Sequence, residues 1–341
     1  MYRRTKQILT ILMMLILLTD PNTIRSGAEA GLAMCIKTVV PALFPFLVVS
    51  ALFNQSMANA EFRFLKPIQR LCGIPDGCSR FLLLGLFGGY PVGAKCINDG
   101  YKAGYITKDN AGRLLGFCSN AGPSFIFGII GCLFDTQSAV WALWAIHIIS
   151  AIIVGMLLPR ADNDRTGLKI SEYSRVDILA QSIKTMTVIC AWVIIFKTAM
   201  LYIDKHLPHE FPDSVITVIS GFLELTNGCI GLQFISGYGF RFVVSAVYIA
   251  FGGLCVSMQT LSVTKDAGIG QYFYGKIMQS LISFLLACFL QYAFWPQEEC
   301  LRLGFGHIMI ALFLLHAILF FIRKKKILAF RENLRYTVIR N

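Results

Sequence analysis

Ten apolar segments constrain the fold of this chain more than any other feature of its sequence. They are 7–19, 31–53, 81–97, 113–134, 139–158, 179–203, 214–235, 240–263, 272–294 and 305–322. A helix needs about 20 apolar residues to cross a bilayer, and most of these segments reach that length. Of the 341 residues, 56% are hydrophobic and 15% are charged, whereas soluble domains carry about 25% charged residues. We therefore expect an all-α polytopic membrane protein in a lipid bilayer, and neither a disordered chain nor a secreted disulfide scaffold.

Two of the ten segments differ from an ordinary membrane span. Segment 81–97 is short and is interrupted by four glycines and by Pro91, and segment 214–235 carries Glu224, Thr226 and Asn227 at its centre. Interrupted backbone is tolerated at membrane depth only inside protein or beside a wet cavity. We therefore predict that these two segments are re-entrant hairpins and that the other eight cross the bilayer.

The loop charges favour this topology. With two hairpins and a cytoplasmic N-terminus, 21 of the 24 Lys and Arg residues outside the apolar segments lie on the cytoplasmic side. With ten crossings the same residues divide 16 to 8. Because cytoplasmic loops carry the excess of Lys and Arg, we expect both termini in the cytoplasm of a bacterial cell, with the chain in the plasma membrane. The net charge of +12 then reflects orientation, and we expect no nucleic acid as a partner.

The first apolar segment has two interpretations. Behind Arg3, Arg4 and Lys6 it is either an uncleaved anchor or a signal peptide cleaved near Ala28-Glu29-Ala30. The distance from the apolar segment to that site is long for a signal, which favours the anchor. Either choice leaves the orientation of the remaining chain unchanged.

The predicted elements form an inverted repeat. Each half contains a lead helix, a hairpin, a helix with a polar or glycine-rich middle, and a final helix, and the second half runs in the opposite direction. Such repeats are typical of secondary transporters. The expected parts are an anchor helix and outer loop (1–30), a first repeat (31–158), a cytoplasmic linker (159–178), a second repeat (179–294), and a last helix with a basic tail (295–341).

Five strings resemble a known family. GLAMCIKTVVPALFPFLVVSALF, FGGYPVGAK, RLLGFCSNAGPSFIFG, GFLELTNG and FGGLCVSMQ are similar to the YlbJ-type sporulation integral membrane proteins, of the nucleoside-recognition (Gate) domain group. The resemblance covers about residues 30–295. It implies a role in spore formation and kinship with concentrative nucleoside transporters, but it assigns no solute.

Glu224 is the strongest single candidate for a functional residue. All eleven aspartates lie in loops or at segment ends, and of the eight glutamates only Glu224 lies mid-segment. Because ionisable residues inside membranes usually mark an ion or substrate path, we expect Glu224, with Thr226 and Asn227, to bind a solute or a coupling ion. The alternative is a Glu that is hydrogen-bonded within the fold.

The remaining candidate residues lie at the other interruptions. Gly88, Gly89, Tyr90, Pro91 and Gly93 form the expected tip of the first hairpin, where Lys95 either reaches an anionic group or extends to the membrane surface. In the first broken helix, the expected polar or unwound positions are Ser119, Asn120, Gly122 and Pro123. Their counterparts in the second broken helix are Gly252, Gly253, Ser257 and Gln259.

These patterns predict a function without enzymatic chemistry. The chain has no H-E-x-x-H motif, no Walker-type glycine loop and no Cys/His metal spacing, so we expect neither a metal nor a cofactor beyond a coupling ion, H⁺ or Na⁺. The favoured reading is a permease-like transporter of a small polar solute, with a nucleoside-like solute as one option. The alternative is a non-transporting sporulation scaffold or channel component. A homo-oligomer and sporulation partner proteins stay open as further partners.

Overall fold

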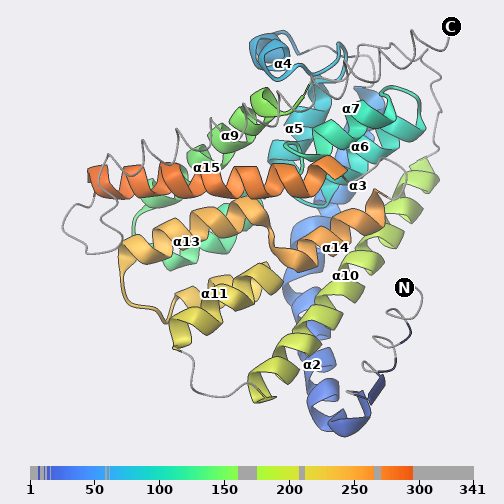
Figure 1. Cartoon of the computed structure of the whole chain (residues 1–341). Coiled ribbons are helices and arrows are strands. Elements are labelled where there is room, and N and C mark those ends of the chain that lie inside the picture. Colours follow the sequence, from blue (N-terminus) through green and yellow to red (C-terminus); the bar gives the residue numbers. More distant parts are fainter. Residues whose placement is uncertain are drawn as a thin grey trace, which may run out of the picture.

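The computed structural model describes residues 7, 11, 14–15, 17–57, 60, 62–159, 175–206, 212–264 and 270–294. Within these residues the chain is helical and has no strand (Figure 1), as the expected all-α class requires. Segment 305–322 and the basic tail, with the expected last crossing, lie outside the described residues, as do six of the thirteen residues of the expected anchor segment 7–19.

The lead helix of the first half is longer than expected and contains a π-helical turn. It consists of α2 (Pro21–Met34), the π-helix η1 (Cys35–Val39) and α3 (Val40–Ser56). Asp20 caps its start by accepting a hydrogen bond from the Thr23 backbone N–H at 3.2 Å. The π-turn lies just before Pro41, which has no N–H to bond the carbonyl of Lys37, so the regular ladder is already interrupted there.

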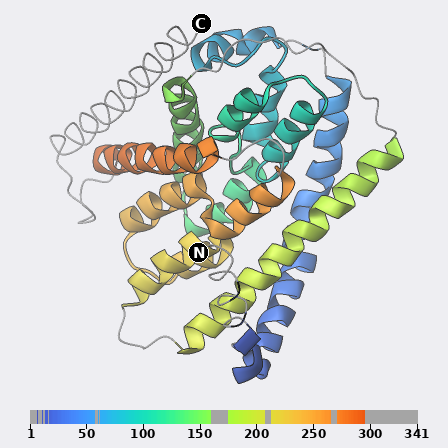
Figure 2. The ribbon, with the colours of Figure 1, turned by 45° about the vertical axis from the view of Figure 1, so that its right-hand side comes forward.

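The lead helices of the two halves pack side by side. The helix α10 (Arg175–His206) runs along α2 and α3 (Figure 2). A Cβ atom added at Gly27 or Gly31 would lie 2.6 Å from the Cα of Thr198 or 2.8 Å from the Cα of Ile194. The two glycines are four residues apart and form a small-residue face that allows the helix backbones to approach closely.

Two helical hairpins occur at the two interrupted segments. The first pairs α5 (Ser79–Phe87) with α6 (Val92–Lys102), and the second pairs α11 (Asp213–Leu223) with α12 (Leu225–Leu232). In each, the helical path is interrupted where the sequence is rich in glycine or polar residues. Both segments therefore turn back along themselves and are not continuous membrane spans.

Two broken helices follow the hairpins. In the first half, α7 (Lys108–Leu115) is separated by a non-helical stretch, 116–122, from α8 (Pro123–Gly128) and the 3₁₀-helix η3 (Ile130–Leu133). In the second half, α13 (Tyr238–Phe251) and α14 (Gly253–Val263) are separated at Gly252, whose φ of 83° lies in the left-handed region that favours glycine.

The two long helices α9 (Gln137–Leu157) and α15 (Gly270–Phe294) complete the core, with α15 packed against both α13 and α9 (Figure 1). At one end, α4 (Lys66–Cys72) packs against α9, and the 3₁₀-helix η2 (Arg63–Leu65) precedes α4 and contacts it. The buried guanidinium of Arg113 joins these elements by donating hydrogen bonds to the backbone carbonyls of Cys72, Gly73 and Gly155.

Five helices of the described part are long and apolar enough to cross a membrane: Pro21–Ser56, Gln137–Leu157, Ile178–His206, Tyr238–Val263 and Gln271–Tyr292. They coincide with five of the eight expected crossings and imply a lipid bilayer as the environment. Large apolar side chains such as Trp141, Ile183 and Ile195 are about half exposed on their outer faces, where lipid would cover them. The expected crossing 113–134 is divided into short helices.

Candidate functional site

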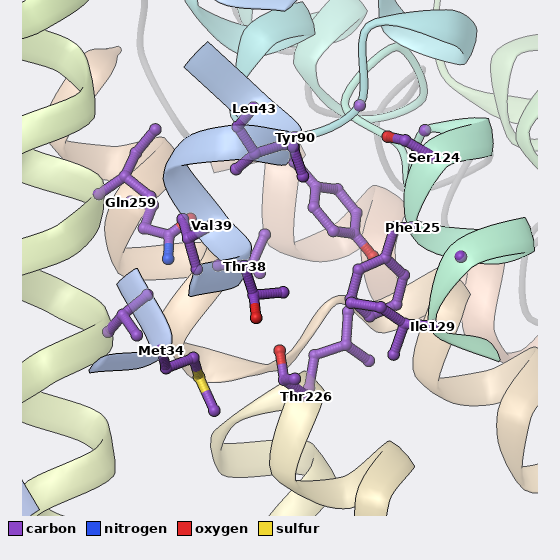
Figure 3. A pocket seen from close by; sticks show the side chains of 18 of the residues that line it. Met34, Thr38, Val39, Leu43, Tyr90, Ser124, Phe125, Ile129, Thr226 and Gln259 are labelled. Carbon is purple, nitrogen blue, oxygen red and sulfur yellow. The ribbon is translucent and has the colours of Figure 1, made fainter. Parts of the chain in front are cut away.

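A cavity of about 320 Å³ lies where the two hairpins and the two broken helices meet (Figure 3). This volume is within the range of about 300–1,000 Å³ that is usual for small-molecule sites. Its wall comes from both halves of the chain. The lining residues are Met34, Lys37, Thr38, Val39, Ala42, Leu43, Gly89, Tyr90, Gly122, Ser124, Phe125, Gly128, Ile129, Ile189, Val193, Glu224, Leu225, Thr226, Val256 and Gln259.

Glu224 lies at the tip of the second hairpin, between α11 and α12. Its carboxylate caps α12, because Oε1 accepts a hydrogen bond from the Thr226 N–H at 3.1 Å and Oε2 accepts one from the Asn227 N–H at 2.7 Å. The side chain is buried and lines the cavity. A carboxylate oxygen has more than one lone pair, so Glu224 can cap the helix and still accept a hydrogen bond from a solute.

The tip of the first hairpin forms the opposite side of the cavity. Gly89 contacts the non-helical stretch of the first broken helix so closely that a Cβ on Gly122 would lie 3.0 Å from the Gly89 Cα. The Tyr90 hydroxyl donates a hydrogen bond to the Ile249 carbonyl of α13 at 3.0 Å. A Cβ on Gly252 would lie 3.3 Å from the Tyr90 ring. The first tip therefore contacts the interruptions of both broken helices.

The lead helix supplies a wall of the cavity whose residues are not among the predicted site residues. Lys37 and Thr38 belong to the π-turn η1, and both line the cavity. In Figure 3 the hydroxyl groups of Thr38 and Thr226 face the same space from opposite sides. The sequence does contain a signal for this part of the site: a lysine and a threonine stand inside an apolar segment just before Pro41. A proline favours an irregular turn before it, and π-turns occur often at functional sites.

Of the predicted site residues, the structure brings six to the cavity: Gly89, Tyr90, Gly122, Glu224, Thr226 and Gln259. Lys95 lies apart from it and forms an ion pair with Asp99 at 2.6 Å, beside a second, polar pocket between α6, α10 and α14. Asn227 accepts a hydrogen bond from the Lys197 ammonium of α10 at 2.6 Å. Ser257 bonds within α14 to the Gly253 carbonyl, and Gly253 approaches the second hairpin tip.

Asn120 belongs to a buried polar cluster behind the cavity wall. Its Oδ1 accepts hydrogen bonds from Gln279 Nε2 at 3.0 Å and from Lys276 Nζ at 3.4 Å, both on α15. Its Nδ2 donates to the Phe117 carbonyl at 2.7 Å. The adjacent Ala121 N–H donates to Nε2 of His147, on α9, at 3.0 Å. Lys276 is not among the predicted site residues, although a lysine inside an apolar segment is as informative as an acid there.

Taken together, the fold and the cavity define a polytopic α-helical membrane protein with an internal chamber between two hairpin tips. The chain is 27% identical over 144 residues to the sporulation integral membrane protein YlbJ of Bacillus subtilis (strain 168). This match covers 41% of the chain and 35% of that protein, so it spans about a third of the relative's length. No protein-family model matches the chain, and no solved structure matches it significantly.

Proposed function

We propose that this protein is a secondary-transporter-like permease that carries a small polar solute across the bacterial cell membrane by alternating access. The observation that carries the proposal is the cavity itself, which lies between the tips of two hairpins from different halves of the chain. Discontinuous elements near the middle of a membrane form the binding sites of many secondary transporters. Glu224, Thr226 and Gln259 supply carboxylate, hydroxyl and amide groups for a polar solute or a coupling cation.

A matched pair of glycine contacts supports the inverted repeat. In the first hairpin a Cβ on Gly93 would lie 2.7 Å from the Gly85 Cα, and in the second a Cβ on Gly228 would lie 2.2 Å from the Gly221 Cα. In both halves this hairpin precedes a helix that is interrupted in its middle. Two related repeats would contain such equivalent features, a glycine-packed hairpin followed by an interrupted helix, in the same order.

A nucleoside-like solute is the first class to test, because the resemblance to the Gate-domain group favours it. The similarity to YlbJ adds spore formation as the biological setting that we propose, with both termini in the cytoplasm. The proposal involves no enzymatic step. An aromatic side chain, Tyr90 or Phe125, would cover the apolar face of a nucleobase, and Glu224 would accept hydrogen bonds from its polar edge or its ribose.

Uptake by proteoliposomes tests this function. Purified full-length protein is reconstituted, an H⁺ or Na⁺ gradient is imposed, and the accumulation of radiolabelled uridine and adenosine is measured. We expect gradient-dependent accumulation that Glu224→Gln abolishes and that Glu29→Gln, an exposed control on α2, preserves. Uptake by Glu224→Gln that equals the wild-type uptake would refute the role of this carboxylate. Absence of gradient-dependent uptake across a wider panel of nucleosides and small polar solutes would favour a scaffold.

A further inference from the structure

Lys276 is a cation buried in the membrane-spanning core with only neutral polar partners. Its side chain is 1% exposed, and its Nζ donates hydrogen bonds to Gln279 Oε1 at 2.9 Å and to Asn120 Oδ1 at 3.4 Å. In the part of the chain that the structure describes, no carboxylate lies within ion-pair distance of it, whereas Lys95 and Lys205 pair with Asp99 and Asp20. Because an unpaired buried charge is costly, such a residue in a membrane usually has a function.

The hydrogen-bonding geometry fits both protonation states of the amine. A neutral amine has two N–H groups, and Gln279 and Asn120 provide two acceptors. A charged ammonium has a third N–H and gains one further attraction, because Nζ lies 5.9 Å from the centre of the Tyr90 ring. Burial among neutral groups disfavours the charged form, while this ring favours it. The proton on Lys276 therefore changes how strongly Tyr90 is held.

No other group in the cluster is as well suited to carry the charge. The ring of Tyr90 faces the amine. The elements packed against α15 carry the following titratable or charged groups: Lys108, Asp109 and Arg113 on α7, His147 on α9, and Tyr238, Arg241 and Tyr248 on α13, with Cys118 in the adjoining non-helical stretch and Tyr272, Tyr274, Cys288 and Tyr292 on α15 itself. His147 is kept neutral because its Nε2 accepts the Ala121 N–H and so has no proton there. Arg113 and Arg241 donate hydrogen bonds to backbone carbonyls elsewhere in the fold.

Two contacts connect Lys276 to the cavity. Tyr90 contacts the ammonium with its ring and is itself part of the cavity wall. Asn120 accepts a hydrogen bond from Lys276 and holds the stretch 116–122, which ends at Gly122 in the cavity wall against Gly89. A change at the amine therefore reaches the first hairpin tip and the first broken helix together.

We propose that Lys276 is a proton-binding site whose charge holds Tyr90 and residues 116–122 in the arrangement that closes the cavity on that side. The proton comes from water and returns to water. Loss of the proton releases Tyr90 and loosens the segment. If the protein is a transporter, which is the part that rests on the proposed function, then the coupling ion is H⁺ and its binding site is Lys276.

Hydrogen–deuterium exchange of the full-length protein in nanodiscs tests this site without any solute. Exchange is followed in peptides covering residues 88–96 and 116–124, from about pH 5 to about pH 9, an interval in which buried lysines lose their proton. Wild type is compared at each pH with Lys276→Arg, which stays charged, and with Lys276→Gln, which stays neutral. The comparison at equal pH cancels the intrinsic pH dependence of exchange.

We expect wild type to match Lys276→Arg at low pH and Lys276→Gln at high pH, with exchange of these peptides differing about tenfold between the two limits. The control His147→Gln retains an acceptor for the Ala121 N–H and should titrate like wild type. The proposal would be overturned if the exchange of these peptides still changed with pH in Lys276→Arg beyond intrinsic chemistry, or if this change disappeared in His147→Gln. So would wild-type exchange that follows intrinsic chemistry alone, a result that does not depend on the variants folding.

The two proposals can fail separately. If the hydrogen–deuterium exchange of the two peptides changes with pH as expected but no solute accumulates in proteoliposomes, the proton site is supported and the transport function is refuted. If uptake depends on an Na⁺ gradient and exchange does not titrate, the transport function stands and the role of Lys276 falls.

Discussion

Gly228 packs against Gly221 at the closest approach of the two arms of the second hairpin. A Cβ atom on Gly228 would lie 2.2 Å from the Gly221 Cα and 2.9 Å from the Tyr248 ring. Both neighbours are constrained, since one is backbone and the other is a buried side chain whose hydroxyl donates hydrogen bonds to the carbonyls of Thr217 and Val218. The position of the second tip, and hence of Glu224, depends on this contact.

Gly228→Ala should therefore destabilise the protein by about 1–3 kcal/mol, the usual cost of overpacking a core. Thermal unfolding of the purified protein in detergent micelles measures the change. Gly128→Ala is the matched control, because nothing lies within 4 Å of its added Cβ, and it should be neutral or slightly stabilising. Equal melting temperatures for the two variants would show that the hairpin arms separate freely.

Arg113 connects α7, α4 and α9 through its hydrogen bonds to three backbone carbonyls. Arg113→Met should lower the free energy of unfolding by about 3 kcal/mol, because it leaves these buried acceptors without their donors. Arg63→Met, at an exposed position, is the control and should change it by less than about 0.5 kcal/mol. Equilibrium unfolding in mixed micelles provides the comparison, and similar values for the two variants would contradict the connecting role.

Asp20 links the start of α2 to the end of α10. Its carboxylate accepts a hydrogen bond from the Lys205 ammonium at 2.6 Å. This bond, together with the hydrogen bonds from Thr23, lowers the pKa of Asp20 from 3.8 to about 2. Because the pKa is lower in the folded state, the ion pair stabilises the protein above pH 3.8, and this contribution is lost as the pH falls towards 2.

Asp20→Asn should therefore be less stable than wild type at neutral pH, and the difference should shrink as the pH falls through this interval. Melting temperatures recorded across the acid range measure it. Glu29→Gln, in the exposed pair with Arg25, is the control and should show a smaller difference at neutral pH. A difference between wild type and Asp20→Asn that is constant with pH would be incompatible with a titrating Asp20.

Glu224 is expected to have a structural role besides its proposed role in binding. Glu224→Ala removes both acceptors at the start of α12 and should cost about 1 kcal/mol of stability. Glu224→Gln keeps one side-chain oxygen and should cost less, which makes it the better variant for transport assays. If equilibrium unfolding gives the two variants the same stability as wild type, the cap contributes nothing.

Much of the fold could be predicted because the membrane simplifies the problem. The apolar segments 31–53, 139–158, 179–203, 240–263 and 272–294 correspond to long helices, since backbone at membrane depth must satisfy its own hydrogen bonds. The interruptions at 81–97 and 214–235 correspond to helical hairpins for the same reason. Segment 113–134 was harder, because a helix pattern does not show how far the chain unwinds before Pro123.

The candidate site was only partly accessible to such reasoning. Glu224 is conspicuous as a lone acid among apolar residues, and it does line the cavity. Lys37 and Thr38 were missed because a π-turn depends on packing against neighbouring helices as well as on Pro41. Lys276 has no local signal beyond its charge and the nearby Gln279, and its other partner, Asn120, is 156 residues away along the chain.

The sequence by itself determined that the chain is helical and belongs in a membrane, because hydrocarbon requires long apolar segments whose backbones bond internally. It also marked where those segments break. Only the tertiary structure decided that both hairpin tips, the break of the first broken helix and α14 of the second meet at one cavity, and that Lys276 lies behind its wall. Those relationships come from close packing between distant segments, which depends on shape and on contacts such as Gly89 with Gly122.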